Sequence, residues 1–222
     1  MHRCWVNGMA DFADTYVEIS DPKGYMRGWE GWDHPERSYI ASLVEGRDSF
    51  LDVGCGGGIT YEALHKIGYL NNDEALECIK YKGVDYSQKF IDACKELFPD
   101  VEWEVQDALH LQEEDSSWDV VYLRNVIENC SYYDIPIKEA YRVARRLVII
   151  TIWQPLQNVD CIMQVGPYTW GNRYEKKAFW KFLRTFKKPI VYRCVKVPEK
   201  EGGRQLTRWV FCIYKKGYSE KK

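Results

Sequence analysis

The stretch LDVGCGGG, residues 51–58, contains four glycines and one small cysteine. Glycine loses more conformational freedom on folding than any other residue, so a cluster of glycines needs a local reason. The residues SFLDVG, 49–54, have the pattern of a short buried strand, and residues 59–69 carry apolar side chains at helical spacing. The glycines therefore lie where a strand passes into a helix, and we expect a ligand or another backbone to come close to them.

Strand and helix patterns alternate along the rest of the chain. Apolar runs predict further strands at 81–86, 101–105, 118–123, 146–153, 190–197 and 206–215. Apolar residues at helical spacing predict helices at 35–45, 88–98, 134–144 and 175–186. Strands that alternate with helices through short connections form a parallel sheet that is covered on both faces. We therefore expect an α/β fold with a doubly wound, mostly parallel seven-stranded sheet and an antiparallel C-terminal strand.

The composition is that of a folded domain of ordinary size. Of the 222 residues, 45% are hydrophobic and 29% are charged. No apolar run approaches the ~18–20 residues that a membrane span needs, and the N-terminus lacks the apolar core of a signal peptide. The eight cysteines form no CxxC pair, which argues against a disulfide framework or a structural zinc site. We expect a cytoplasmic protein with no membrane span, and its oligomeric state stays open.

The charge is spread unevenly along the chain. Residues 175–222 hold 15 Lys and Arg against 4 Asp and Glu, whereas residues 1–174 hold 16 against 29. A solvated basic face that balances the acidic part explains this distribution. Attraction of an anionic substrate, nucleic acid included, explains it as well. Both interpretations stay open from the sequence.

Two common ligands of such a glycine-rich turn are excluded by the neighbouring residues. A P-loop needs Lys followed by Ser or Thr after the glycines, and no such pair follows Gly58. A dinucleotide-binding turn needs a third small residue where Ile59 stands. The remaining pattern is an acid followed by three alternating glycines, formed here by Asp52, Gly54, Gly56 and Gly58. This pattern resembles the first motif of the class I S-adenosylmethionine-dependent methyltransferases.

The resemblance continues downstream, so that residues 49–152 follow the family pattern in order. Asp85 ends the second strand, where the family places an acid that receives both ribose hydroxyls of the cofactor. Asp107 follows the third strand, where the family places an acid near the adenine amino group. WDVVYLRNVIEN, 118–129, is similar to the fourth-strand motif. The resemblance implies S-adenosyl-L-methionine as cofactor and these binding residues: Asp52, Gly54, Cys55, Gly56, Gly58, Asp85, Tyr86, Ser87, Asp107, Ala108, Arg124 and Asn125.

Three features depart from the best-known family members. The spacing from Gly58 to Asp85 is long, because a polar insertion surrounds residues 71–77. Asn129 stands where the fourth-strand motif often has His. The segment VARR, 143–146, replaces a glycine-rich turn before the fifth strand. None of these positions belongs to the expected cofactor contacts.

The sequence lacks the signatures of several acceptor classes. The [DNS]PP[YFW] motif of amino-methylating DNA enzymes and the Pro-Cys pair of cytosine C5 enzymes are absent after the fourth strand. Acids that would hold a metal beside a catechol-type acceptor are absent after the fourth and fifth strands. We therefore expect no metal.

Two aromatic segments are candidates for holding the acceptor. They supply the candidate substrate residues Tyr25, Trp29, Trp32, Trp170, Asn172 and Arg173, and the weak catalytic candidates His34, Tyr168 and Arg173. Each of these residues has an alternative role in packing, capping or solvation. By resemblance, residues 1–48 form an N-terminal helical and aromatic lid segment. Residues 49–222 then form a single cofactor-binding domain, in which 153–173 is a substrate loop.

The sequence as a whole indicates an enzyme that transfers a methyl group to a small-molecule or sugar-type acceptor by in-line displacement. An RNA or protein methyltransferase that uses the basic C-terminal region is the second interpretation. A non-catalytic module that binds S-adenosylmethionine is the third. A general base is needed only where the acceptor must lose a proton, so the lack of an evident catalytic triad excludes none of them.

Overall fold

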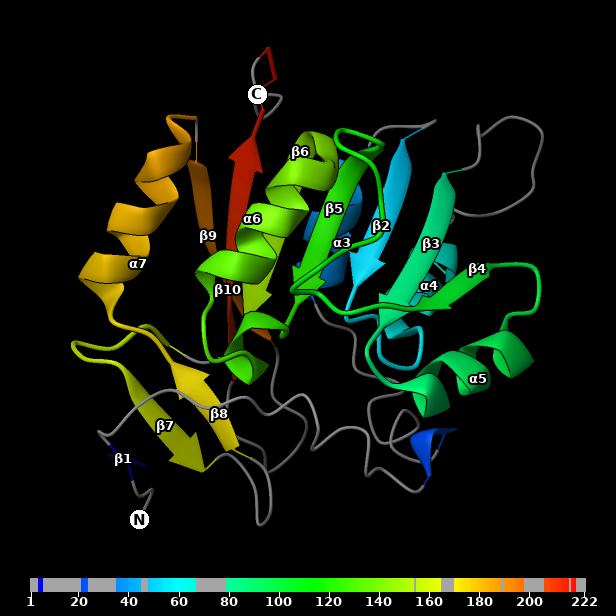
Figure 1. The fold of residues 1–222 in the computed structure, drawn as a ribbon, viewed down its shortest axis with the longest axis horizontal. Helices are drawn as coiled ribbons and strands as arrows, with labels where there is room; N and C mark the ends of the chain where they lie inside the picture. Colours follow the sequence, from blue (N-terminus) through cyan, green and yellow to red (C-terminus); the bar gives the residue numbers. More distant parts are fainter. Residues whose placement is uncertain are drawn as a thin grey trace.

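The central feature of the fold is one twisted seven-stranded sheet (Figure 1). The computed structural model describes residues 4–5, 21–23, 35–44, 48–66, 79–153, 155–164, 170–188, 190–197, 206–215 and 217–218. The strands of the large sheet are β2 (Ser49–Val53), β3 (Lys80–Asp85), β4 (Glu102–Val105), β5 (Trp118–Arg124), β6 (Ala144–Ile152), β9 (Ile190–Val197) and β10 (Leu206–Tyr214). Their spatial order is β4-β3-β2-β5-β6-β10-β9.

The direction of the strands confirms the predicted fold class. The strands β4, β3, β2, β5 and β6 pair in parallel. The strand β10 is antiparallel to both of its neighbours, β6 and β9. The strand order reverses at β2. The next strand in sequence, β3, pairs with one edge of β2, and β5 pairs with the other edge. In sheets of this class ligands bind outside the carboxyl ends of the strands at such a switch point.

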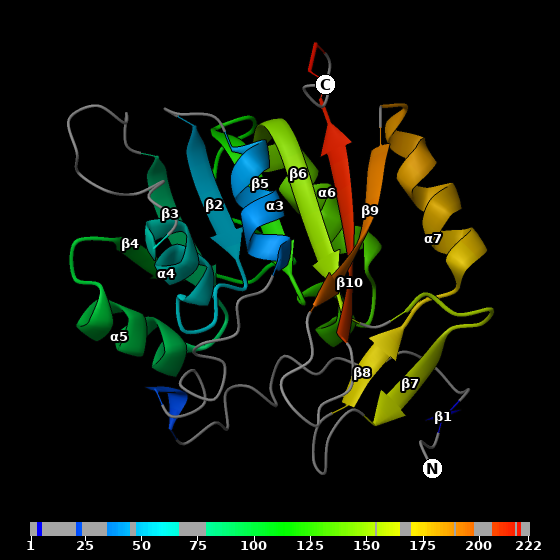
Figure 2. The ribbon, with the colours of Figure 1, turned by 180° about the vertical axis from the view of Figure 1, so that it is seen from behind.

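Helices cover both faces of the sheet, and each face has its own apolar core (Figure 2). One face carries α3 (Pro35–Leu43), α4 (Ile59–Lys66) and α5 (Gln88–Leu97). The other carries α6 (Asp134–Val143) and α7 (Lys176–Leu183). Strand residues alternate between the faces: Phe211 and Ile213 pack toward α6 and α7, whereas Val210 and Cys212 pack toward α3. This alternation is the period-2 pattern that the sequence shows.

A close approach between β3 and β4 depends on one glycine. Gly83 of β3 pairs directly with Trp103 of β4. The Trp103 ring lies over Gly83, so that a Cβ built on Gly83 would be 2.2 Å from Trp103 Cζ3. Trp103 in turn makes edge contacts with Tyr61 and Tyr81, at 5.8 and 5.7 Å between ring centroids. A glycine inside a strand marks such a site, where a side chain must pass over the backbone.

A second, three-stranded sheet stands beyond the carboxyl ends of the parallel strands (Figure 1). It consists of β1 (Cys4–Trp5), β7 (Cys161–Gln164) and β8 (Trp170–Arg173), all antiparallel. The sequence predicts a loop without structure of its own at 153–173. The structure instead places the strands β7 and β8 within this segment. Both strands within the predicted loop are four residues long. The segment WGNR has no apolar alternation, and the pattern of the sequence therefore gives no signal there.

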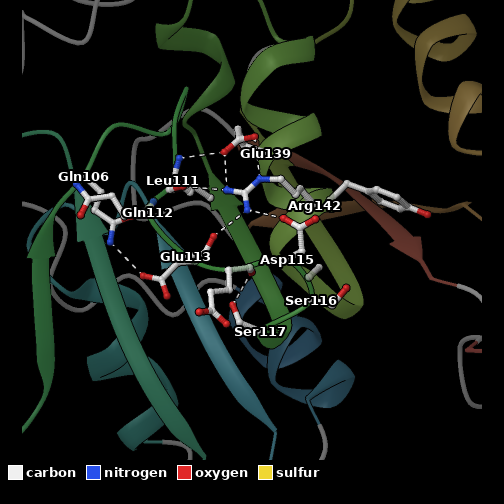
Figure 3. Close-up of polar contacts among 12 residues, drawn as sticks. Gln106, Leu111, Gln112, Glu113, Asp115, Ser116, Ser117, Glu139 and Arg142 are labelled. Carbon is white, nitrogen blue, oxygen red and sulfur yellow. Dashed lines mark hydrogen bonds and ion pairs between the residues drawn. The ribbon is translucent and has the colours of Figure 1, made fainter.

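Arg142 of α6 holds the loop that follows β4 (Figure 3). Its Nη1 donates to the carbonyl oxygen of Glu113 and to Asp115, each at 2.8 Å. Its Nη2 donates to the carbonyl oxygen of Leu111 at 2.9 Å and to Glu139 at 2.8 Å. This one guanidinium therefore fixes the path of the chain between β4 and β5.

None of the helices within the described ranges is long and apolar enough to cross a membrane.

Candidate cofactor site

The glycine-rich turn between β2 and α4 has a left-handed backbone at three of its glycines. Gly54, Gly56 and Gly58 have φ values of +71°, +54° and +79°. A Cβ on Gly54 would be 2.4 Å from Cγ2 of Val126, and one on Gly58 would be 3.1 Å from two aromatic rings. A Cβ on Gly56 would meet no atom within 4 Å. Gly54 and Gly58 are thus required by packing, whereas Gly56 faces open space at the ligand edge of the sheet.

Asp85 at the end of β3 is positioned by this turn. Its Oδ2 accepts a hydrogen bond from the backbone N–H of Gly56 at 2.8 Å, and its Oδ1 accepts one from the N–H of Ser87 at 2.9 Å. Each carboxylate oxygen has two lone pairs, so each retains one for a further donor. Burial raises the pKa of the Asp85 carboxyl, and the two N–H donors act in the opposite direction. The geometry suits an acceptor for two neighbouring hydroxyl groups.

The two residues after Asp85, Tyr86 and Ser87, differ in their exposure to solvent. The Tyr86 side chain is 46% exposed, which leaves an aromatic face at the ligand edge. Ser87 is buried at the N-cap position of α5. The sequence predicts Ser87 as the N-cap of this helix, and the structure confirms that position, although the Ser87 hydroxyl makes no capping hydrogen bond. The backbone N–H of Ser87 donates to Asp85.

Asp52 lies beneath the turn with no exposed surface. Its Oδ2 accepts a hydrogen bond from the Tyr81 hydroxyl at 2.6 Å. Burial is the main cause that raises the pKa of Asp52 to about 6, and hydrogen bonds from Tyr81 and Thr60 act against it. A contact of Asp52 with the cofactor, direct or through water, stays a prediction.

The raised pKa of Asp52 predicts a pH-dependent contribution to stability. The folded state retains the proton of Asp52 up to about pH 6, whereas the unfolded chain loses it near pH 3.8. Stability from this group is therefore present below the unfolded pKa and is lost as the pH rises through this window. The loss corresponds to ~1.4 kcal/mol per pKa unit, or about 3 kcal/mol in all. Asp52→Asn, which keeps an acceptor for Tyr81, should remove this dependence.

Urea unfolding of the wild type and of Asp52→Asn, without cofactor and at several pH values from 4 to 8, measures this effect. The stability difference between the two proteins should change between about pH 4 and 6 and stay constant above. A difference that is the same at every pH contradicts the assignment.

Asp107 and Ala108 lie in the loop that Arg142 holds. Asp107 is exposed, and its Oδ1 accepts a hydrogen bond from the N–H of Leu109 at 2.8 Å. Ala108 is half-buried against the core on the side of α6. At the start of this loop, the N–H of Gln106 donates to the carbonyl oxygen of Asp85, the last residue of β3, at 3.0 Å. The structure thus links the loop of Asp107 directly to Asp85.

Arg124 and Asn125 follow each other at the end of β5. Arg124 Nε donates to Oε1 of Glu36 at 2.7 Å, so this side chain is held by the start of α3. Asn125 has a positive φ of +56°, and its N–H donates to the carbonyl oxygen of Thr151 in β6 at 2.8 Å. A strained non-glycine residue at the end of a central strand is a feature of functional sites.

The buried polar atoms of this region fit a polar ligand. Within the described residues, two side-chain oxygens of the predicted cofactor set are buried without a hydrogen-bond partner: Ser87 Oγ and Asn125 Oδ1. Buried polar atoms are otherwise nearly always satisfied. These oxygens belong to the residue before α5 and to the residue after β5, and the strands that lead to them flank β2 and its glycine-rich turn. A nucleoside with an amino acid group carries both donors and acceptors, and the residues present therefore fit S-adenosylmethionine.

Cys55, within the turn, and Cys94, in α5, are both buried and are both free thiols. Cys94 Sγ lies 3.3 Å from the carbonyl oxygen of Gly56. Cys55 Sγ lies 3.6 Å from the same oxygen. Burial raises the pKa of the Cys55 thiol. Both side chains support the turn from within the core.

The candidate substrate residues are only partly described. Tyr25, Trp29, Trp32, His34 and Tyr168 lie outside the described residues, and of Trp170 only the backbone position in β8 is described.

Two further candidates belong to β8. Asn172 is fully buried, and its Nδ2 donates to the carbonyl oxygen of Cys130 at 2.6 Å. The Arg173 side chain is half-buried. This contact gives Asn172 a structural role in joining the small sheet to the segment between β5 and α6. A substrate role for either residue stays a prediction.

Several residues of this region were not predicted from the sequence. Glu36, Glu128 and Arg208 are all buried near the ends of β5 and β6. Tyr174 is also buried, and its hydroxyl oxygen lies 2.5 Å from the carbonyl oxygens of both Ile127 and Cys130, which share its single proton. In sequence, Glu36 looks like an ordinary acid in the first turn of a helix, and Arg208 looks like one of many basic residues near the C-terminus. Within the described ranges, no three Cys, His, Asp or Glu side chains gather as ligands for a metal.

Comparison with known proteins gives one matching domain family. Residues 51–151 match the family described as "Methyltransferase domain". A demethylmenaquinone methyltransferase of Lactobacillus johnsonii is 25% identical over 150 residues, which are 64% of this chain and 56% of the relative. A mitochondrial ubiquinone biosynthesis O-methyltransferase of Candida albicans is 29% identical over 142 residues, which are 64% of this chain and 33% of that protein. The matched regions thus span about half and a third of these relatives.

Solved structures show the same fold at low identity. The [4+2]-cyclase SpnF has a TM-score of 0.66 at 14% identity, over 96% of this chain and 99% of that chain. The 1,6-didemethyltoxoflavin-N1-methyltransferase of Burkholderia thailandensis, solved with its namesake compound and S-adenosylhomocysteine, has a TM-score of 0.63 at 14% identity. This match covers 93% of this chain and 90% of that chain.

Proposed function

We propose that this chain is a class I S-adenosylmethionine-dependent methyltransferase and that it transfers a methyl group to a small-molecule acceptor. The match of residues 51–151 to the methyltransferase domain family supports this proposal. The cofactor is S-adenosyl-L-methionine. The observation that carries the proposal is the arrangement of Asp85 and Gly56. A half-buried carboxylate with one lone pair free on each oxygen lies beside a glycine that faces open space.

We assign the cofactor contacts as follows. Asp85 receives the ribose hydroxyls, and the exposed ring of Tyr86 together with Asp107 and Ala108 borders the adenine. The methionine end lies against the bare backbone of Gly54 to Gly58, where N–H groups at the start of α4 favour a carboxylate. The cofactor supplies a methyl group already activated by a sulfonium. The protein aligns the acceptor in line with that methyl group and excludes water.

The acceptor side lies at the same edge, toward β5 and β6. We propose that residues 1–48 act as a lid over this edge and that 153–173 contribute to the acceptor site. The small sheet of β1, β7 and β8, which stands beyond the strand ends, supports this placement. A cytoplasmic location is part of the same proposal.

The names of the two relatives favour a small-molecule acceptor over a macromolecule. One is named as a demethylmenaquinone methyltransferase and the other as an O-methyltransferase of ubiquinone biosynthesis, so both names refer to quinones. We therefore place quinone-type aromatic compounds first among the acceptors to be tested, with sugar-type metabolites second.

The test is formation of S-adenosylhomocysteine from S-adenosylmethionine. Purified protein is incubated with the cofactor alone, with demethylmenaquinone, and with a small-molecule extract from which macromolecules have been removed. Product that depends on an added small molecule supports the proposal. Cofactor binding without product in any arm would instead support a non-catalytic module.

A methyltransferase that acts on RNA is the second candidate, because basic side chains gather at one end of the sheet. The exposed cations of α7, the turn after it and β9 are Lys176, Lys177, Lys181, Arg184, Lys187, Arg193 and Lys196. Binding of RNA through phosphate contacts would weaken steeply between 50 and 200 mM salt, by about 1,000-fold or more for six or more contacts. Methyl transfer to total RNA with this salt dependence, and none to small molecules, would favour the second candidate.

A further inference from the structure

Two arginines from different strands converge on one buried acid beside the candidate cofactor site. Glu36, in the first turn of α3, has no exposed surface. Arg124 Nε donates to its Oε1 at 2.7 Å, and Arg208 Nε lies 3.2 Å from its Oε2. Only the pair with Arg124 has the geometry of a hydrogen bond.

This cluster lies at the ligand edge of the sheet. Arg124 is the last residue of β5 and precedes Asn125 of the predicted cofactor set. Arg208 comes directly before Trp209, which pairs with Ile152, the last residue of β6. Arg124 thus ends a central parallel strand, and Arg208, near the start of the antiparallel strand β10, lies beside the carboxyl end of β6. Both stand on the β5 and β6 side of the switch point, where the acceptor would be placed.

Among the described residues, two guanidinium nitrogens of Arg208 are buried without a hydrogen bond. The residue is only 2% exposed. Within the part of the chain that the structure describes, neither its Nε nor its Nη1 donates a hydrogen bond. A guanidinium has five N–H donors in a fixed fork, and leaving buried charged donors unsatisfied is unfavourable. The Nε faces Glu36 Oε2 at 3.2 Å as an ion pair, so it is the Nη1 donors that have room for a further acceptor at this edge.

The charges around Arg208 are consistent with a missing anion. Glu36 is shared with Arg124, and the other carboxylate that stabilises the Arg208 charge, Glu128, accepts a hydrogen bond from the N–H of Trp153 at 2.8 Å. Burial is the main cause that lowers the pKa of Arg208, and the charge of Arg124 lowers it further. An added anion would therefore stabilise a cation that its present neighbours leave only partly compensated.

We propose that Arg208 binds an anionic oxygen group, a carboxylate or a phosphate, of the methyl acceptor. A guanidinium fork matches two oxygens of either group. The inference rests on the proposed function for the identity of the ligand. Binding of an anion at Arg208 can be tested without an assay of methyl transfer. It predicts that acceptors without an acidic group are poor substrates.

The first measurement is thermal unfolding in sodium phosphate and in sodium benzoate, each with the ionic strength held constant by NaCl. A ligand that binds only the folded state raises the unfolding temperature as its concentration exceeds the dissociation constant. We expect at least one of the two probes to stabilise the wild type more than NaCl does. The apparent affinity of Arg208→Met for that probe should be at least tenfold weaker. Phosphate active alone indicates a phosphorylated acceptor, and benzoate active alone indicates a carboxylic acid.

Two variants separate this effect from loss of charge or of folding. Arg145→Met removes an exposed arginine at the start of β6, away from the ligand edge and outside the basic group of α7 and β9, and should respond to the probes as the wild type does. Arg208→Lys keeps the charge without the fork and should lie between the wild type and Arg208→Met, which keeps the test valid if Arg208→Met does not fold. Equal stabilisation of all variants, or no stabilisation of the wild type, overturns the inference.

The affinity for S-adenosylmethionine distinguishes this inference from the proposed function. Calorimetric titration should give the same cofactor affinity for Arg208→Met and for the wild type. A tenfold or larger loss in the variant would assign Arg208 to the carboxylate of the cofactor and overturn its assignment to the acceptor. Absence of cofactor binding in the wild type would refute the proposed function, while the anion measurement would still report on Arg208.

Discussion

Replacing Asp85 with alanine should lower the affinity for S-adenosylmethionine by about 100-fold or more. The carboxylate has one lone pair left on each oxygen for the two ribose hydroxyls. Each hydrogen bond to a charged group contributes about 1.5–3 kcal/mol, so the loss of two corresponds to two or more factors of ten. Isothermal titration calorimetry with the cofactor measures the effect directly.

The same substitution also removes the acceptor for the N–H groups of Gly56 and Ser87, so folding must be checked. Circular dichroism and thermal unfolding establish whether Asp85→Ala is folded. Asp85→Asn keeps one oxygen acceptor and should bind with intermediate affinity. Asp100→Ala removes an exposed acid from the turn before β4 and should bind as the wild type does. A folded Asp85→Ala with unchanged affinity would remove the ribose assignment.

Replacing Gly83 with alanine should destabilise the fold by about 3 kcal/mol or more, because its Cβ would overlap the Trp103 ring. The Cβ would lie 2.2 and 2.4 Å from two ring atoms, and Trp103 is only 4% exposed. The ring can move only by disturbing its contacts with Tyr61 and Tyr81. For a chain of 222 residues this loss corresponds to a fall in Tm of about 6–12 °C.

Gly56→Ala is the matched control for this effect. Its Cβ would meet no atom within 4 Å, and its only cost is the left-handed backbone at φ +54°. That strain costs about 1 kcal/mol for a non-glycine residue. Urea unfolding should therefore rank Gly83→Ala well below Gly56→Ala in stability. Equal stability of the two variants would show that the Trp103 ring yields without cost.

The strands and helices of the large sheet were predictable because their apolar patterns are long and regular. Continuous apolar runs such as 118–123 have the pattern of buried parallel strands. The predicted helix at 134–144 corresponds closely to α6. The glycine-rich turn and Asp85 were predictable for a different reason. A left-handed turn at the end of a strand restricts the residues that fit it, so its chemistry is visible in the sequence.

The partners of the buried polar groups were not predictable in the same way. The hydrogen bond of Tyr81 to Asp52 depends on the register between β2 and β3, which no single strand contains. The convergence of Arg124 and Arg208 on Glu36 depends on β10 lying next to β6 and on the placement of α3 across the sheet. The small sheet was missed because its strands are short, and their pairing is decided by tertiary contacts rather than by alternation.

The position of β10 has a consequence for how the protein is made. This strand is synthesised after β9, yet it lies between β6 and β9. While the chain leaves the ribosome, β6 therefore exposes an unpaired edge, and β9 has no neighbour in the sheet until residues 206–214 emerge. An open edge on so apolar a strand is a template for pairing with another nascent chain. The large sheet is complete on this side only after β10, the last strand to be synthesised, has paired between β6 and β9.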